Sequence, residues 1–113
     1  MQLSRPLPDD LVDLIARRFR VLGEPMRIKL LDRLREGETT VNELAEALAS
    51  SPQNVSKHLG VLADVGIVGR RKHGTRISYG IVDESIFALR EQVCGAVQQH
   101  LETLNKRLSG AQR

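Results

Sequence analysis

Four polar residues, Gln53, Asn54, Ser56 and Lys57, stand within five positions of this 113-residue chain. Gln and Asn side chains can pair with the edge of an adenine, and Lys can reach a guanine or a phosphate. At about 100° per residue, a helix through this segment turns Val55 inward and Gln53 and Lys57 outward. Asn54 and Ser56 lie at the edges of the outer face. The pattern predicts a helical face that reads bases in a major groove, with an ordinary solvated face as the alternative.

Two neighbouring residues complete this candidate set. Ser51 precedes Pro52, so its hydroxyl is expected to cap the N-terminus of the helix. His58 adjoins the apolar stripe that contains Val55 and Leu59. We expect a structural histidine at that position first and a DNA contact second.

A basic segment follows the helix. Residues 56–80 hold five Lys or Arg and one Asp, a net charge of +4, whereas the other 88 residues sum to −1. A two-residue turn at His73-Gly74 would set Arg71 opposite Arg76, and these like charges would repel unless phosphates neutralised them. We expect contacts with phosphates or the minor groove, and a solvated basic face is the alternative. The candidate wing residues are Arg70, Arg71, Lys72, His73 and Arg76.

Cap and breaker residues predict four short helices before this hairpin. Their expected bounds are residues 9–22, 25–37, 41–48 and 52–65. A capping box at Thr40 and Glu43 opens the third helix. The second should turn Ile28, Leu31 and Leu34 toward the core. Three residues, 49–51, separate the third helix from the fourth, so this pair should form a helix-turn-helix.

The rest of the chain predicts a wing and a long last helix. Alternating Ile77, Tyr79 and Ile81 indicate a half-buried strand in a hairpin over residues 67–82. The last helix should run from about Glu84 to Leu108 after a cap at Asp83. Apolar residues recur along it at spacings of three or four, at positions 86, 89, 93, 97, 101, 104 and 108. We expect a second chain to cover this row, and a helix folded back on its own domain is the alternative.

Three runs resemble the ArsR/SmtB family of bacterial repressors. They are FRVLGEPMR at 19–27, ELAEAL at 43–48 and residues 51–59, which end in VSKHL. The resemblance covers about residues 10–108. It implies a homodimer joined through its first and last helices, bound to an inverted-repeat operator and released by an effector. The residues expected at the dimer interface are Leu11, Ile15, Phe19, Val93, Val97, Leu101 and Leu104.

The expected fold is therefore a dimeric winged helix-turn-helix, mainly α with a small β-hairpin, in the order α-α-α-α-β-β-α. A content of 41% hydrophobic but 3% aromatic residues suits packed helices better than a β-sandwich. We expect one domain over residues 1–113, with the terminal helices, about 9–22 and 84–108, joining two chains.

The chain departs from the metal-binding patterns of the family it resembles. One pattern has Cys-Val-Cys where this chain has Thr40-Val41-Asn42. The other needs Asp-x-His followed ten residues later by His-x-x-Glu or His, and this chain offers Asp83, Ser85, Ala96 and Gln99. One ligand in four does not hold a metal, so we expect neither a metal nor a cofactor.

Cys94, the single cysteine, offers no internal disulfide, and the sequence shows no signal peptide and no apolar run of about 20 residues. We expect a cytoplasmic protein without a membrane role. Cys94 lies near the midpoint of the last helix, so it is a candidate thiol switch, with an inert packing cysteine as the alternative. The effector is left open between a small molecule and a redox signal.

The sequence lacks a Gly-rich phosphate loop, a pair of catalytic carboxylates and a nucleophile with an evident His partner, so we do not expect an enzyme. We expect a transcriptional regulator that binds double-stranded DNA. The alternative is a winged-helix interaction module whose basic hairpin docks an acidic partner protein. Steep salt dependence of duplex binding would favour the first of these.

Overall fold

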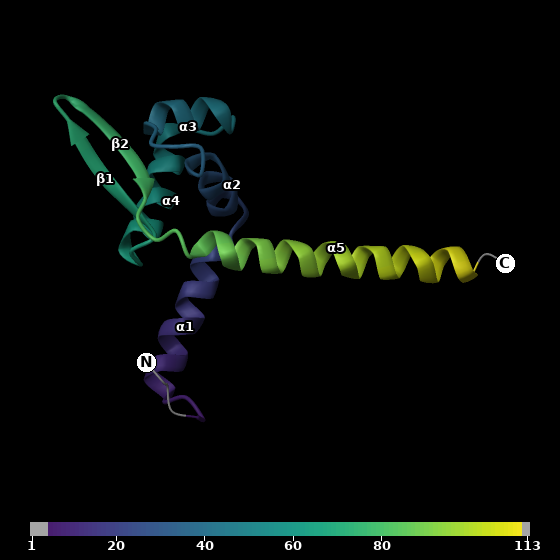
Figure 1. Cartoon of the computed structure of the whole chain (residues 1–113). Helices are drawn as coiled ribbons and strands as arrows, with labels where there is room; N and C mark the ends of the chain where they lie inside the picture. The colour runs from purple at the N-terminus through teal and green to yellow at the C-terminus, as the bar shows by residue number, and fades with distance from the viewer. Residues whose placement is uncertain (1–4, 112–113) are drawn as a thin grey trace. The chain divides into compact units, whose positions relative to one another are not determined.

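The computed structural model describes residues 5–111, and the chain divides after Val82 into two compact units. The first unit holds helices α1 to α4 and the hairpin β1–β2, and the second holds α5 (Figure 1). The order α-α-α-α-β-β-α confirms the predicted fold class. Among the described helices, none combines the length and the apolar character that a bilayer span requires.

The bounds of the elements lie close to the predicted ones. The elements are α1 (Asp9–Leu22), α2 (Pro25–Leu34), α3 (Val41–Ala47), α4 (Pro52–Asp64), β1 (Val68–His73), β2 (Arg76–Ile81) and α5 (Ile86–Ala111). α2 ends before the predicted Gly37, because residues 35–36 form a turn. α5 begins after the predicted Glu84, because the Asp83 carboxylate accepts from the N–H of Ser85 at 3.0 Å and holds a turn there.

Side-chain caps fix where three of the helices begin. Each cap accepts a hydrogen bond from the N–H three residues on: Glu24 from Arg27 at 2.9 Å, Thr40 from Glu43 at 3.2 Å and Ser51 from Asn54 at 3.1 Å. These bonds satisfy N–H groups that have no partner inside the first helical turn. The Thr40 and Ser51 caps were predicted, and the Glu24 cap was not.

The core of the first unit lies where α2, α3, α4 and the start of β1 meet. Its fully buried side chains are Leu30, Leu44, Val55, Leu59, Leu62 and Ile67. The prediction for α2 was wrong at Ile28, which is 48% exposed, because Leu30 is buried in its place. Ile28 lies six residues before the buried Leu34, about 120° away around the helix, and so does not share its face.

α1 is tied to the end of α4 by one side chain. The guanidinium of Arg18 donates to the carbonyl of Val65, the residue that follows α4, at 2.9 Å. The end of a helix leaves such carbonyl groups without a partner inside the helix. This bond therefore satisfies an otherwise unpaired acceptor and fixes α1 against the helix expected to read DNA.

The hairpin turn differs from the predicted one. His73 pairs with Arg76 across the two antiparallel strands, so the two-residue turn is Gly74-Thr75. Gly74 has a φ of +65°, which a glycine adopts without the clash that a Cβ atom would cause. In this register Arg71 stands opposite Ser78. The predicted pairing of Arg71 with Arg76, and the repulsion inferred from it, are therefore wrong.

The two faces of β2 are also buried differently from the prediction. Ser78 and Gly80 are buried, and the residues between and beside them are only half-buried: Ile77, Tyr79 and Ile81. The loop before α3 explains this reversal. Thr39 exchanges two backbone hydrogen bonds with Tyr79, of 3.1 and 2.8 Å, and a Cβ atom at Gly80 would lie 2.9 Å from Cγ of Glu38. The loop therefore covers the face that carries Ser78.

Candidate nucleic-acid interface

The outer face of α4 presents three of the predicted polar residues to solvent. Gln53, Ser56 and Lys57 are exposed, whereas Val55 and Leu59 on the inner side are fully buried. Within residues 5–111 no other group pairs with the side chains of these three polar residues. Their hydrogen-bonding capacity is therefore available to a partner outside the chain.

Two other members of the candidate recognition set are engaged in the turn before α4. The hydroxyl of Ser51 accepts from the N–H of Asn54 at 3.1 Å, and Nδ2 of Asn54 donates to Oγ of Ser50 at 3.0 Å. Ala49, with a φ of +50°, completes the turn. This arrangement favours a role in shaping the turn for Ser51 and Asn54, more than a role in reading bases.

His58 points into the protein. Its residue is 8% exposed, and Nδ1 lies 3.1 Å from Nη1 of Arg27 and 3.7 Å from Oε2 of Glu24. A guanidinium can only donate, so Nδ1 is the acceptor of this bond. Arg27 also donates from Nε to the carbonyl of Val21 at 2.6 Å. His58 thus joins α4 to the junction of α1 and α2, which favours its structural interpretation over a DNA contact.

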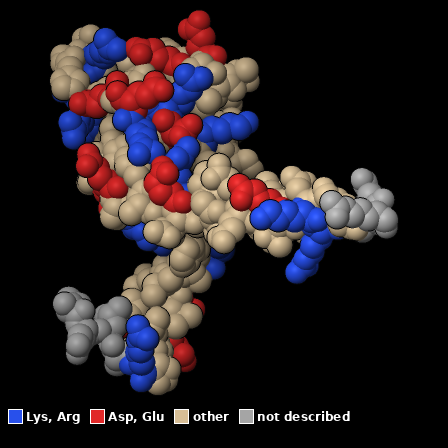
Figure 2. All heavy atoms as spheres, turned by 45° about the vertical axis from the view of Figure 1, so that its right-hand side comes forward, with Lys and Arg blue, Asp and Glu red and all other residues tan. Residues whose placement is uncertain are grey.

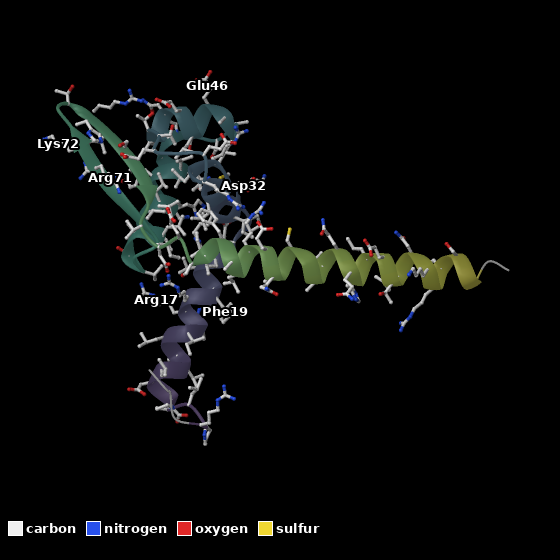
Figure 3. All side chains as sticks on the ribbon, in the orientation of Figure 1. Arg17, Phe19, Asp32, Glu46, Arg71 and Lys72 are labelled. Carbon is white, nitrogen blue, oxygen red and sulfur yellow. The ribbon has the colours of Figure 1, made fainter. Side chains whose placement is uncertain are left out.

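The register of the hairpin divides the candidate wing residues between its two faces. Directly opposed residues of an antiparallel pair share a face, and successive residues alternate. Arg71, His73 and Arg76 therefore lie on one face, and Arg70 and Lys72 lie on the other. Figure 3 shows Arg71 and Lys72 leaving β1 on opposite sides.

Glu38 occupies the face that carries Arg71. Its Oε2 accepts from Nη1 of Arg71 at 2.9 Å, its Oε1 accepts from the hydroxyl of Ser78 at 2.6 Å, and Nε2 of His73 lies 3.3 Å from Oε1. The hydrogen bonds from Ser78 and His73, followed by the charge of Arg71, lower the pKa of the Glu38 carboxyl below its usual 4.5. Glu38 is therefore an anion at neutral pH.

Arg76 is paired in the same way with an acid of α3. Its Nη2 donates to Oε1 of Glu43 at 2.7 Å, while Oε2 of Glu43 accepts from the hydroxyl of Thr39 at 2.8 Å. Hydrogen bonds from Thr39 and Thr40 and the charge of Arg76 lower the pKa of the Glu43 carboxyl. Glu43 thus turns to the hairpin and to Thr39, which the predicted capping box did not include.

The other two cations of the hairpin strands are Arg70 and Lys72. Over the described range 5–111, the side chains of Arg70 and Lys72 make no hydrogen bond or ion pair. On the face of the first unit that Figure 2 shows, acidic and basic side chains are interspersed. The positive charge that the sequence concentrates in residues 56–80 is therefore partly neutralised by Glu38 and Glu43.

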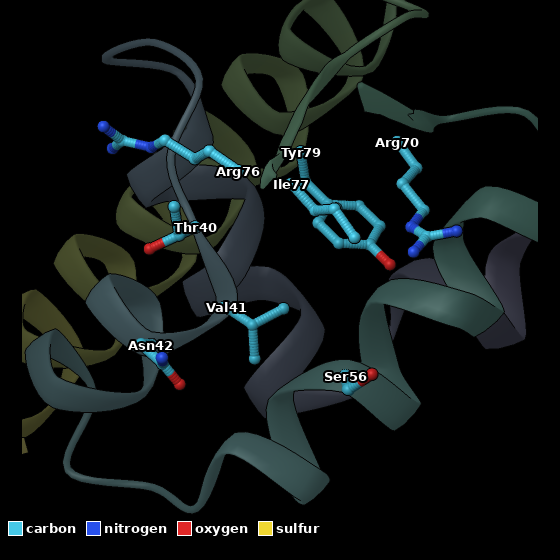
Figure 4. A pocket seen from close by; sticks show the side chains of 8 residues that line it. All are labelled: Thr40, Val41, Asn42, Ser56, Arg70, Arg76, Ile77 and Tyr79. Carbon is cyan, nitrogen blue, oxygen red and sulfur yellow. The ribbon is translucent and has the colours of Figure 1, made fainter. Parts of the chain in front are cut away.

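A hollow of about 380 Å³ lies between the hairpin and helices α3 and α4. The polar groups that line it include Thr40, Asn42, Ser56, Arg70, Arg76 and Tyr79. In Figure 4, Arg70 extends toward the helix that carries Ser56, and Arg76 extends away from it. Arg70, which has no partner among the described residues, thus extends toward the helix whose polar face is exposed.

The predicted dimer residues include a long exposed apolar row. On α5 the exposed fractions range from 36% to 63%, at Leu89, Val93, Val97, Leu101, Leu104 and Leu108. On α1, Phe19 is 57% exposed, and Leu11 and Ile15 are half-buried. A single chain therefore leaves apolar side chains uncovered on both of its terminal helices.

Neither metal binding nor thiol chemistry gains a site from the structure. Within residues 5–111 no group of three or more His, Cys, Asp and Glu side chains could hold a metal ion. Asp83, the one residue that fits a family metal pattern, accepts a hydrogen bond from the N–H of Ser85 in the turn before α5, so it does not cap the first turn of the helix as predicted. Cys94 is a free thiol exposed on α5. Independence from metals and a switch at Cys94 both stay predictions.

Sequence reasoning missed Glu38, which lies 33 residues before Arg71 and 40 before Ser78. In the sequence it reads as an ordinary acidic loop residue. Its one local signal is the pair of small residues, Ser78 and Gly80, in an otherwise bulky strand. Small residues alternating on one face of a strand are typical of a close approach by another segment.

Four helices followed by an antiparallel hairpin, with α3 and α4 joined by a short turn, define a winged helix-turn-helix domain. A family model described as a helix-turn-helix domain matches residues 22–71. The chain is also similar to the homodimeric winged helix-turn-helix DNA-binding domain of Mb0332 from Mycobacterium bovis. The TM-score is 0.75 at 31% identity, over 89% of this chain and 94% of that one.

Two curated relatives point to the same family. The transcriptional regulator KmtR of Mycobacterium tuberculosis is 39% identical over 81% of this chain and 68% of its own length. A probable mercury resistance operon repressor of Streptomyces lividans is 39% identical over 66% of this chain, which spans 59% of that protein. The chain belongs to the ArsR/SmtB family of transcriptional regulators. The resemblance noted in the sequence is thereby confirmed.

Proposed function

We propose that this protein is a transcriptional repressor that binds an inverted-repeat operator as a homodimer and is released from it by an effector. The observation that carries the proposal is the outer face of α4. Gln53, Ser56 and Lys57 are exposed there, and none of them has a side-chain partner within residues 5–111. In winged helix-turn-helix proteins the N-terminal part of this helix contacts base edges in the major groove.

The hairpin supplies contacts of a different kind. Arg70 and Lys72 are unpaired in the described chain and carry their charge on the face of the hairpin opposite Glu38. Contacts with phosphates position a protein on the duplex and strengthen binding, but they carry no sequence information. In this proposal α4 selects the operator, and the hairpin adds affinity for any duplex.

A second copy of the chain covers the apolar row of α5, together with Leu11, Ile15 and Phe19 of α1. The exposure of that row supports this part of the proposal, as does the homodimeric state of the related Mb0332 domain. Two-fold symmetry presents two copies of α4, with half-sites about 34 Å apart or a multiple of that spacing. An inverted repeat follows from this symmetry. Both units of the chain thus act as one functional domain.

The relatives are named transcriptional regulators and repressors, which supports DNA binding over the docking of an acidic partner protein. We therefore place the protein in the cytoplasm with the DNA that it binds. We assign it no enzymatic activity, no cofactor and no membrane partner. These assignments rest on the family and on the site residues.

The effector is proposed to be a small molecule or a redox signal, with Cys94 on α5 as the candidate thiol. Operator binding by wild type and Cys94→Ser should be compared before and after mild peroxide treatment. Release of wild type alone would support the thiol switch, and equal responses would leave a small molecule as the effector. Release by stoichiometric zinc or nickel would contradict the prediction that no metal is bound.

Selection of bound sequences from a random duplex pool tests the proposed function. Wild type should enrich an inverted repeat, and a variant with Gln53→Ala and Lys57→Ala should enrich it much less. A matched control is Glu46→Gln on α3, which should enrich the same repeat as wild type. Salt-dependent capture of duplex without any enriched sequence would contradict sequence-specific recognition.

A further inference from the structure

Glu38 reaches the hairpin from the loop between α2 and α3 and engages it with both carboxylate oxygens. One oxygen accepts from Arg71 at 2.9 Å, and the other accepts from Ser78 at 2.6 Å. Thr39 pairs with β2 through its backbone, and Gly80 leaves room for the Glu38 side chain. Backbone pairing, a buried serine and a glycine thus combine to hold one carboxylate beside one arginine.

This pairing competes with duplex DNA. A carboxylate and a phosphate present similar pairs of oxygens to a guanidinium, so both seek the same donors. A cation already neutralised inside the protein releases no counterion from DNA until its internal partner leaves. Arg71 is 54% exposed and Glu38 33% exposed, so the pair is open to solvent and a phosphate can displace the carboxylate.

We propose that Glu38 limits the sequence-independent attraction of the hairpin for duplex DNA by holding Arg71 away from phosphates. This inference rests on the proposed DNA-binding function and deepens it by assigning a residue that opposes binding. Arg70 and Lys72, on the other face, lie beyond the reach of this restraint because the register turns them away from Glu38. Among the described residues, the hairpin therefore carries two available cations, Arg70 and Lys72, and two that are paired with acids, Arg71 with Glu38 and Arg76 with Glu43.

The test uses the full-length dimer and labelled duplex of random sequence, with affinity measured over a series of salt concentrations. Glu38→Gln keeps the shape of the side chain and its acceptor for Ser78 but removes the charge. It should strengthen binding. It should also steepen the slope of the logarithm of affinity against the logarithm of salt concentration by about 0.9 per protomer, or about 1.8 per dimer. The control Glu46→Gln removes an equal charge from α3, where Glu46 projects away from the hairpin (Figure 3). It should leave the slope unchanged.

A second pair of variants identifies the released cation. Arg71→Gln in the wild-type background should change the slope little, and in the Glu38→Gln background it should abolish the gain. Circular dichroism confirms that each variant is folded. Weaker binding by Glu38→Gln, a slope equal to that of Glu46→Gln, or a full loss of about 0.9 per protomer from Arg71→Gln alone would overturn the inference. Wild type that binds no duplex at any salt concentration would instead contradict the proposed function.

Discussion

Arg70 and Arg76 line the same hollow, yet their replacement should affect duplex binding differently. Arg70 is unpaired in the described chain, whereas Arg76 donates to Glu43 at 2.7 Å. We expect Arg70→Gln to flatten the salt dependence of binding to a random duplex, because it removes a cation available to phosphate. Arg76→Gln should leave the slope nearly unchanged, because its charge is already neutralised within the protein.

The magnitude follows from the cations of α4 and the hairpin that lack a partner among residues 5–111, which are Lys57, Arg70 and Lys72. Six such cations in a dimer predict a log–log slope of about −5.4, and Arg70→Gln should reduce it to about −3.6. Between about 50 and about 200 mM salt, affinity should then fall roughly 2,000-fold for wild type and roughly 150-fold for the variant. Fluorescence anisotropy of a labelled duplex measures both slopes.

Equal slopes for Arg70→Gln and Arg76→Gln would refute this reasoning. The difference between the two variants is the decisive quantity, because contributions from cations elsewhere in the chain cancel in it.

Three further results are expected. Leu59→Ala should lower the free energy of unfolding in denaturant by about 2–5 kcal/mol, because Leu59 is fully buried. Ile28→Ala, at a 48% exposed position, should lower it much less. Equal losses in the two variants would contradict the assigned core. Val97→Glu should sediment as a monomer or unfold, and Gln99→Glu on the opposite side of α5 should remain a dimer; a dimer of Val97→Glu would exclude this face. The lowered pKa of Glu38 contributes stability above its usual 4.5 that is lost as pH falls through the folded-state pKa. The thermal stability difference between wild type and Glu38→Gln should therefore shrink in acid, and a difference that grows would contradict the pairing.

Local signals were enough to place the helices. Thr40 and Ser51 cap α3 and α4 at the predicted residues, and Gly23 ends α1 where a glycine interrupts the apolar pattern. Each signal acts within a few residues, so it is visible in the sequence alone. The outward direction of Gln53 and Lys57 follows equally from helical geometry.

The hairpin register depends on which two residues form the turn, and the sequence supports two positions equally well. Both His73-Gly74 and Gly74-Thr75 supply a glycine to a two-residue turn, and they differ in which residue takes the first position. The structure places Gly74 first, with a φ of +65°. A shift by one residue changes every cross-strand partner, so this single difference removed the predicted contact between Arg71 and Arg76.

The ion pairs of the hairpin lay beyond sequence reasoning for another reason. Glu38 and Arg71 are 33 residues apart, and the alternating pattern of β2 gave no sign that a loop would cover Ser78. The prediction from sequence took every cation of residues 56–80 to be available to phosphates. The structure shows instead that two acids from outside the segment engage two of its arginines.

The central claim is that α4 selects the operator while the hairpin adds affinity for any duplex, and the ratio of operator to random-duplex affinity tests it most directly. Lys57→Ala should lower this ratio by about 1–3 kcal/mol, roughly 5- to 150-fold, because it removes a contact to a base. Lys72→Ala should weaken binding to both duplexes alike and leave the ratio unchanged. An unchanged ratio in Lys57→Ala, or a reduced ratio in Lys72→Ala alone, would contradict the account.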